Sequence, residues 1–593
     1  MQKNERKHVP ITTRFDTVWA RVLISALLTA AAVLVCMKVQ TITYLTNDDN
    51  AIAQVLAGWQ TGKPYPYAMF INALLGYAVS GLYRILPDVS WWAVLQLAVI
   101  GISLTAIGAV LLRCAGRNGQ SVWVPLLAFG GLVMLLAVQP VVELTYTVTA
   151  VFAGAAGAAL VVAANEETAA KRKTMDVLGA AFTVVAFLYR EESGFAVLCF
   201  FGAACFYRFL RIAMSLKETD AEGQPGKLSA QAVRRLLQPL LLGCVVIAVC
   251  IGAFAWNNAM HLKVNGTEYT EYFTWRERFT DYPRDTYEQN PELYDSVGWD
   301  ATLYDLADNW CFLDGRINAE NLRTITQNST HVHAPGLQSA VKNGISVIEE
   351  NLSARMTAMT MLCMAALAIY GWIRGGKTAA AEAITLLCCL LGTAALCLYL
   401  CLSGRFLLRT FRAIAIPATV LCMVLLLQMP PFTRRLERAL LPVLLVGLGL
   451  ISGFFTARDL RYNSPKEILQ QSKSVNQYVL EHPENVYIRD TQTIRDLDAF
   501  TVYPQDKPIN LLSWGGCGLR SDASKRQFAA CGLQAMDASI FENDNVYFIT
   551  AEDGTAKDVL LDYLIHWKGA RALKREDSFA GIGVYRVIYH GAE

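Results

Sequence analysis

Charge is what this sequence has least of. Only 17% of its 593 residues are charged and 54% are hydrophobic, whereas ordinary soluble domains carry roughly 25% charged residues. The apolar residues gather in runs of about 20, the length that crosses the hydrocarbon core of a bilayer. An ordinary soluble protein of several domains is therefore excluded, and the chain is predicted to cross a membrane many times.

Other familiar signatures are also missing. No GxxxxGK[ST] loop occurs, so we do not expect this chain alone to drive transport with ATP. No CxxC pair or Cys/His cluster indicates a metal site, and His331 and His333 form only an isolated HxH pair. Most of the 15 cysteines lie in apolar runs as small core residues, while Cys517 and Cys531 could pair in an oxidising compartment. The net charge of +2 gives no indication of nucleic-acid binding.

Eleven apolar runs are candidates for membrane helices. They lie at 20–45, 91–112, 122–139, 147–165, 177–190, 194–211, 236–256, 354–373, 379–402, 411–429 and 438–456. The two short runs at 177–190 and 194–211 could instead form a bent hairpin that does not fully cross. Basic residues precede the first run, and no small-residue cleavage site precedes Asp48, so the run is predicted to be a retained first helix.

Basic residues in short loops predict the orientation of the helices. A cytoplasmic N-terminus puts five basic loops on the cytoplasmic side, as the positive-inside rule requires; these loops carry Arg113 and Arg117, Lys171 to Lys173, Arg234 and Arg235, Arg374 and Lys377, and Arg434, Arg435 and Arg438. Segments 46–90, 257–351 and 457–593 then lie on the opposite, extracytoplasmic side.

The chain is predicted to divide into a transmembrane domain, 1–456, and a C-terminal domain, 457–593. The second is soluble in character and alternates β-like runs with helical patterns, which predicts a small α/β domain. The β-like runs lie at 485–490, 544–550 and 582–588, and the helical patterns lie around 465–481 and 555–567.

Two further segments, 50–62 and 68–86, are too short or too interrupted to be clear spans. We expect them to be amphipathic helices on the outer membrane surface. If 68–86 were a true span, every later loop would change sides and the bias of the basic loops would be lost.

Two adjacent carboxylates, Asp48 and Asp49, follow the first span in "TNDDNAIAQVLAGWQTGKPYP" (46–66). A positioned carboxylate can accept the proton of a sugar hydroxyl as that hydroxyl attacks an anomeric carbon. A neighbouring like charge raises the pKa of one member of the pair. The alternative is that the acids cap the helix predicted at 50–62, a role that needs no second acid.

Three arginines depart from the charge bias. Arg405, Arg409 and Arg412, in "SGRFLLRTFRAIAIP" (403–417), lie at the outer end of two spans. Their spacing places all three on one face if the segment is helical. Guanidinium groups bind phosphate through two hydrogen bonds, so these residues are the candidate phosphate site; snorkelling to lipid headgroups is the alternative.

Other charged residues are candidates for the same cavity. "FLYREESGF" (187–195) places Arg190 and Glu191 between two short apolar arms, where charges line a cavity or pair with one another, and Arg190 with a glutamate could be a structural ion pair. Glu143 is a lone acid between the third and fourth spans. The loop 257–351 interleaves aromatic with charged residues, which suits sugar faces; we favour a lid that contributes to acceptor specificity, although a lid held by ion pairs without acceptor contact fits equally.

The order of these features resembles the GT-C superfamily of membrane glycosyltransferases. The resemblance covers the whole layout, and its sharpest part is "NDD" at 47–49 followed by "AGWQTGKPYPYAMFINALLG" at 57–76. It implies an enzyme that moves a hexosyl or pentosyl group from a polyprenyl-phosphate donor to a glycan, lipid or protein acceptor of the cell envelope. It also implies a multi-pass protein of a bacterial plasma membrane, with membrane lipids as further partners and the reaction at the extracytoplasmic face.

The resemblance also suggests roles for individual residues. Asp48 and Asp49 take the place of the acidic catalytic motif, although many members carry Asp-Glu or Asp-x-Asp there. Glu191 stands where an "RPE"-like turn has its proline, beside Arg190. Glu143 corresponds to a second acidic group that organises the site or a divalent metal, the one cofactor that the resemblance allows.

Two other function classes stay open. A transporter or flippase of a lipid-linked saccharide would show paired halves with broken spans, whereas the spans here are mostly unbroken and asymmetric. A non-catalytic GT-C-like assembly protein of the envelope is not distinguished while the acidic pair is intact.

Overall fold

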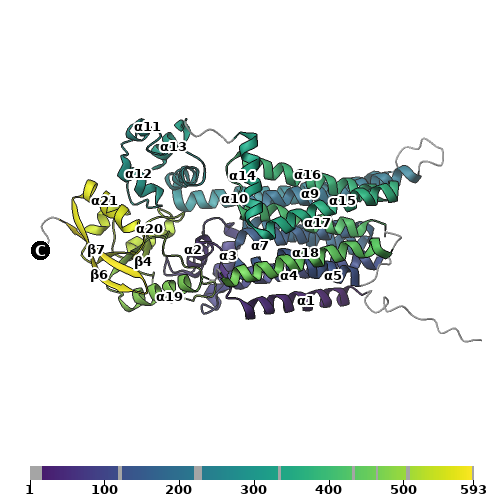
Figure 1. The fold of residues 1–593 in the computed structure, drawn as a ribbon, viewed down its shortest axis with the longest axis horizontal. Helices are drawn as coiled ribbons and strands as arrows, with labels where there is room; N and C mark the ends of the chain where they lie inside the picture. The colour runs from purple at the N-terminus through teal and green to yellow at the C-terminus, as the bar shows by residue number, and fades with distance from the viewer. Residues whose placement is uncertain are drawn as a thin grey trace, which may run out of the picture.

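The computed structural model describes residues 17–117, 123–219, 230–330, 336–430, 435–462, 465–502 and 508–589. Helices dominate it. They form an elongated bundle, and a smaller body that contains a five-stranded sheet sits at one end of the bundle (Figure 1).

The predicted runs all coincide with helices, which are long except for α5 with its 14 residues. These are α1 (Val18–Val39), α4 (Trp91–Arg117), α5 (Trp123–Leu136), α7 (Tyr146–Ala163), α8 (Ala169–Tyr189), α9 (Glu191–Thr219), α10 (Ala230–Asp281), α15 (Leu352–Gly375), α16 (Ala380–Leu402), α17 (Leu408–Gln428) and α18 (Arg435–Tyr462). Within the described residues, 8 stretches are long and apolar enough to cross a membrane, and one of them, Leu352–Leu402, contains both α15 and α16. The prediction of a polytopic helical membrane protein is confirmed.

The short runs at 177–190 and 194–211 lie in two adjacent helices that meet at Arg190, and only the second of these helices contains one of the 8 stretches that are long and apolar enough to cross a membrane. The first run belongs to α8, a helix of 21 residues, and the second to α9, a helix of 29 residues. Hydropathy underestimated the length of both helices because polar residues form part of each one. In α8 these include the basic run Lys171 to Lys173 in its first turns.

Two helices form the centre of the bundle. All residues of α7 are buried, and so is most of α17. The sequence of α7 is rich in Ala and Gly, and small residues let helix backbones approach closely. A Cβ on Gly157 would lie 2.7 Å from the carbonyl oxygen of Gly179 in α8.

Short elements fill the segment between α1 and α4. The strand β1 (Thr43–Tyr44) pairs in parallel with β2 (Glu143–Leu144), and the helices are α2 (Asn47–Ala57) and α3 (Ala73–Ile85), with α6 (Val138–Val142) just before β2. With 11 and 13 residues, α2 and α3 are too short to cross about 30 Å of hydrocarbon. More than half of α2 is buried, so this helix is wedged between the bundle and the sheet-bearing body.

The predicted loop 257–351 is largely helical. It begins as a continuation of α10, which reaches Asp281 through a break at Gly266 (φ 84°, ψ 168°). Further helices follow: α11 (Pro291–Asp295), α12 (Ala301–Asp308), α13 (Ala319–Asn328) and α14 (Leu337–Glu350). We call residues 267–328 the roof; one of these residues, Trp310, lines the cavity described below.

The C-terminal segment forms the predicted α/β unit. Its elements are α19 (Lys466–Glu481), β3 (Val486–Arg489), β4 (Leu511–Ser513), α20 (Asp522–Ala530), β5 (Val546–Ala551), α21 (Ala556–Lys568), β6 (Ala570–Phe579) and β7 (Ile582–Tyr589). The strand order is β4-β3-β5-β7-β6, with β3 parallel to β4 and β5, and with β7 antiparallel to β5 and β6. The predicted strands and helices are all present, whereas β4, β6 and α20 were not predicted.

The roof and the C-terminal sheet share one hydrophobic core. Buried side chains of the roof, such as Trp299 and Phe312, belong to the same cluster as Trp514 and Phe548 of the sheet region. The roof is therefore packed against the C-terminal α/β unit through a common core.

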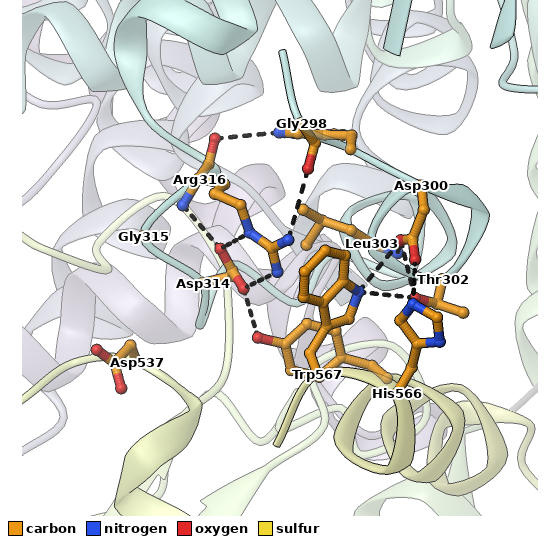
Figure 2. Close-up of polar contacts among 12 residues, drawn as sticks. Gly298, Asp300, Thr302, Leu303, Asp314, Gly315, Arg316, Asp537, His566 and Trp567 are labelled. Carbon is orange, nitrogen blue, oxygen red and sulfur yellow. Dashed lines mark hydrogen bonds and ion pairs between the residues drawn. The ribbon is translucent and has the colours of Figure 1, made fainter. Parts of the chain in front are cut away.

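A polar cluster joins the same two parts at their surface. Figure 2 shows the guanidinium of Arg316 over the ring of Trp567, 3.7 Å from its centroid. The indole N–H of Trp567 donates to Asp300, and Asp314 accepts from Arg316 at 2.7 Å and from the hydroxyl of Tyr563. These contacts join the roof to α21 through a cation–π contact and hydrogen bonds.

The crossing of α5 and α18 allows a matched test of the packing. A Cβ on Gly131 would lie 2.6 Å from the carbonyl oxygen of Leu445, whereas a Cβ on the adjacent Gly130 would meet nothing within 4 Å. We expect Gly131→Ala to destabilise the protein by about 1–3 kcal/mol and Gly130→Ala to leave it unchanged or slightly stabilised. Thermal unfolding of the purified full chain in detergent measures both, and equal midpoints for the two variants would contradict the close crossing.

Candidate functional site

Asp49 is the most firmly held residue of the acidic pair. Its side chain is completely buried in the first turn of α2. One carboxylate oxygen, Oδ1, accepts hydrogen bonds from Gln96 Nε2 (2.9 Å), Trp92 Nε1 (3.3 Å) and the backbone N–H of Tyr146 (3.0 Å). The other, Oδ2, accepts from Thr46 Oγ1 at 3.3 Å. Asp49 thereby ties α2 to α4 and α7.

Burial raises the pKa of Asp49 to about 7, and the nearby charge of Asp48 adds to this effect. The hydrogen bonds from Tyr146, Gln96 and Trp92 act in the opposite direction, because they favour the carboxylate. The neighbouring like charge that was expected to raise one pKa of the pair contributes to this rise, but burial is the larger cause.

The capping alternative for the acidic pair is not observed. The N-cap position of α2 is Thr46, and both aspartates lie inside the first turn. The carboxylate of Asp49 bonds to other elements of the bundle instead of the free N–H groups of its own helix.

Asp48 faces the opposite way, into a cavity of about 390 Å³ between α2, the roof and the C-terminal domain. Its side chain is 30% exposed, and Oδ2 lies 3.9 Å from Nη1 of Arg409. Burial raises the pKa of Asp48, and the guanidinium groups of Arg409, Arg190 and Arg276 partly offset this rise. Of the two aspartates, Asp48 is the one with an oxygen available to a ligand.

The predicted arginine face is only partly formed. Arg409 and Arg412 lie on α17, but that helix begins at Leu408, so Arg405 precedes it. Arg405 pairs with Asp281 (2.6 Å) and Glu277 (3.2 Å) at the end of α10. It therefore holds the base of the roof and does not share a helical face with the other two.

Arg412 and Glu143 are joined through a residue that the sequence did not indicate. Arg412 donates a hydrogen bond to the amide oxygen of Gln139, and Gln139 Nε2 donates to Glu143 Oε2 at 2.6 Å. Glu143 is the first residue of β2, beside β1 and close to the start of α2. The structure thus brings the separately predicted Glu143 and Arg412 into one network, one helical turn from Arg409.

The adjacent residues Arg190 and Glu191 direct their side chains to different partners. Arg190 lies between α8 and α9, donates to the hydroxyl of Tyr146, lies 5.6 Å from the ring centroid of Phe70, and pairs with the exposed Glu192 at 3.3 Å. Phe70 lines the cavity, so Arg190 lies close to the part of the cavity that Phe70 lines, which we call the floor.

Glu191 points elsewhere. It accepts hydrogen bonds from Asn257 (2.9 Å) and Asn72 (3.3 Å). It therefore connects α9 with α10 and the start of α3, and it is not the partner of Arg190.

Unusual backbone conformations surround the cavity. Phe70 (φ 67°) and Trp310 (φ 61°) both have positive φ and both line the cavity. Such conformations cost about 1–3 kcal/mol in residues other than glycine and cluster at functional sites. Gly515 packs so tightly on Trp310 that a Cβ there would lie 1.6 Å from the Trp310 carbonyl oxygen.

Several site residues were not found from the sequence. Gln96 could have been found, because it is a lone amide within an apolar run, and polar residues in such runs are often functional. Gln139, Tyr146 and Arg276 gave none, because their role depends on distant contacts. Arg276 is only 2% exposed, and among the described residues it makes no ion pair.

The described residues do not gather into a metal-binding group. No cluster of three or more His, Cys, Asp or Glu side chains occurs among them, and the oxygens of Asp49 are already hydrogen-bonded. His331 and His333 lie outside the described residues. Cys517 and Cys531 are free thiols, so the disulfide considered for them is not formed.

Comparison with known proteins gives a loose structural similarity. No protein-family model and no curated protein sequence matches the chain. Among solved structures, the chain is similar to ArnT from Cupriavidus metallidurans bound to undecaprenyl phosphate, with 13% identity, 95% of this chain and 97% of that chain covered, and a TM-score of 0.38. The apo state of the same ArnT gives 13% identity, 94% and 97% coverage, and a TM-score of 0.37. At such TM-scores two chains can share an order of elements without superposing closely, so the similarity assigns no activity to this chain.

The burial of Asp49 predicts a distinctive pH dependence of stability. Its pKa is about 7 in the folded protein and about 4 in an unfolded chain, so between these values the folded state binds more protons. The contribution of Asp49 to stability then falls as pH rises through this window, by up to about 1.4 kcal/mol per unit. Thermal unfolding at pH 5.5 and pH 8 should show this loss for the wild type.

In the Asp49→Asn variant the side chain is neutral and keeps an oxygen acceptor. This variant should therefore lose the part of the pH dependence of stability that comes from Asp49. The exposed Asp88→Asn is the control and should behave as the wild type does. An unchanged slope in Asp49→Asn would contradict the assignment.

Proposed function

We propose that this protein is a membrane glycosyltransferase of the GT-C type. It moves a sugar from a polyprenyl-phosphate donor to a hydroxyl group of a cell-envelope acceptor. The observation that carries the proposal is the geometry of the acidic pair: Asp49 is buried and fully hydrogen-bonded, whereas Asp48 opens into a large cavity opposite an arginine.

Asp48 is the general base in this proposal. As the acceptor oxygen attacks the anomeric carbon, its proton passes to a carboxylate oxygen of Asp48. The new bond joins the acceptor oxygen to the sugar, and the bond between the sugar and the phosphate oxygen breaks. The raised pKa of Asp48 suits this role, because it brings the base closer to working pH.

The arginines stabilise the leaving group. The donor is a phosphate diester, and the released polyprenyl phosphate is a monoester with additional negative charge. Arg409 lies beside Asp48, and its distance of 3.9 Å from the Asp48 carboxylate leaves both groups able to contact substrates. Arg190 adds positive charge near the floor, and Arg412 is held one turn away by Gln139 and Glu143. Each guanidinium group can donate two parallel hydrogen bonds to the oxygens of one phosphate.

Asp49 and Arg405 are positioning residues. Asp49 fixes the first turn of α2, and with it the direction of Asp48. Arg405 connects the start of α17 to the roof through Asp281 and Glu277. Glu191 performs a similar supporting role between α9, α10 and α3.

The membrane orientation is part of the proposal. Helices α4, α7 and α17 begin near Asp48, so their other ends lie at the opposite end of the bundle, where the basic loops are found. With those loops in the cytoplasm, Asp48 and the C-terminal domain are extracytoplasmic. A donor phosphate at headgroup level is then close to Arg409.

Replacing the base tests the proposal. With short-chain polyprenyl-phosphate sugars and an envelope glycan fraction as acceptor, we expect Asp48→Asn to slow release of polyprenyl phosphate by about 10²–10⁴-fold. The exposed Asp88→Asn should keep full activity. Undiminished release by a folded Asp48→Asn would overturn the proposal, and donor binding without release by the wild type would favour a non-catalytic or flippase role.

The charge of Arg409 gives a second, independent test. Because Arg409 lowers the pKa of Asp48, Arg409→Gln should raise that pKa and move the acidic limb of the kcat/KM profile to higher pH. Arg409→Lys keeps the charge, so its limb should stay near the wild-type position even if its rate is lower. If the limb of Arg409→Gln does not move, Asp48 is not the group that the profile reports.

A further inference from the structure

The far wall of the cavity belongs to the C-terminal sheet. The cavity is lined there by Arg489 at the end of β3, by Thr491 and Arg495 after it, and by the glycine-rich turn after β4 at 515–518. The two strands are parallel, and Arg489 at the end of β3 is level with Ser513 at the end of β4. In open α/β sheets, ligands bind in the crevice outside the carboxyl ends of parallel strands. The cavity lies at that edge.

Polar atoms in the cavity lining have no partner. Arg489 Nε, Thr491 Oγ1 and Asn47 Oδ1 are buried and make no hydrogen bond within the described part of the chain. They come from two distant segments, which are joined by a hydrogen bond of 3.2 Å from Asn47 Nδ2 to the Thr491 carbonyl. Buried polar atoms are normally paired, so three such atoms in the cavity lining, two from the sheet region and one from α2, indicate a place that a polar ligand completes.

The charge on the wall points to an anion. Neither Arg489 nor Arg495 forms an ion pair with any other described residue, whereas Arg316 and Arg405 each bind a carboxylate. The acid on this wall is Asp496, which is buried and accepts from Asn476 at 3.4 Å. The turn after β4 leaves room beside these arginines, since a Cβ on Gly516 or Gly518 would meet nothing within 4 Å.

We propose that the carboxyl ends of β3 and β4 form the acceptor subsite, and that the acceptor is a polyhydroxy compound with a phosphate or carboxylate group. Arg489 and Arg495 bind the anionic group. Asn47 and Thr491 bind hydroxyl groups between the arginines and Asp48. The acceptor role rests on the proposed function, whereas anion binding by Arg489 does not.

Equilibrium binding tests the subsite without turnover. Isothermal titration of the purified full chain in detergent with sn-glycerol 3-phosphate, glycerate and glycerol compares a phosphate, a carboxylate and a neutral polyol. We expect the anionic probes to bind at least about tenfold more tightly than glycerol, since charge-assisted hydrogen bonds are the strong ones. The tighter of the two anions identifies the acceptor group.

Variants assign the binding to Arg489. Arg489→Gln should weaken the anionic probes at least about tenfold, while Arg489→Lys retains part of the affinity and Arg571→Gln, an exposed control on β6, retains all of it. The lysine variant and the unfolding midpoint show that the loss is not misfolding. Equal affinity for glycerol and the anions, or unchanged affinity in a folded Arg489→Gln, would overturn the proposal.

The outcome is separable from that of the proposed function. Asp48→Asn should keep the affinity for the anionic probes although it loses transfer. Anion binding that depends on Arg489 without any transfer activity would refute the glycosyltransferase and leave the anion subsite. Transfer activity with no such binding would refute the subsite alone.

Discussion

The carboxylate of Asp49 is the contact on which the site depends. Its Oδ1 accepts from two residues of α4 and from the first residue of α7, so a helix of only 11 residues is fastened to two long ones. These hydrogen bonds hold the first turn of α2 in place. They therefore also set the direction of the side chain of the preceding residue, Asp48. One member of the acidic pair is structural and chemically occupied, and the other can therefore stay available.

The arginines near Asp48 also differ in how strongly the protein holds them. Arg405 is neutralised by two carboxylates of α10, Arg412 is held by an amide, and Arg409 keeps only a long contact of 3.9 Å with Asp48. A guanidinium with strong partners stabilises the fold, and one with a weak partner is free to bind a ligand. The neighbouring arginines of one sequence motif thus have different partners in the structure.

The sequence predicted the long helices, the strands that are rich in Val, Ile and Tyr, and the acidic pair, because each leaves a local pattern. It could not show that Glu191 turns toward Asn72 and Asn257 while Arg190 turns toward Tyr146, since adjacent residues at a helix junction can point in different directions. It also could not show that Arg405 precedes α17, because the ends of helices are poorly determined by spacing. Residues such as Gln139 and Arg276 gain meaning only from partners more than a hundred positions away or on other segments.

The core shared by the roof and the C-terminal sheet has a consequence for how such a chain can evolve. Trp299 and Phe312 are separated in sequence from Trp514 and Phe548 by more than two hundred residues and four long helices, yet they pack in one cluster. Neither segment could be exchanged for that of another protein without exposing half of this cluster to water. We therefore expect a change of side-chain volume in one segment to require a matching change in the other, even though the chain encodes them apart.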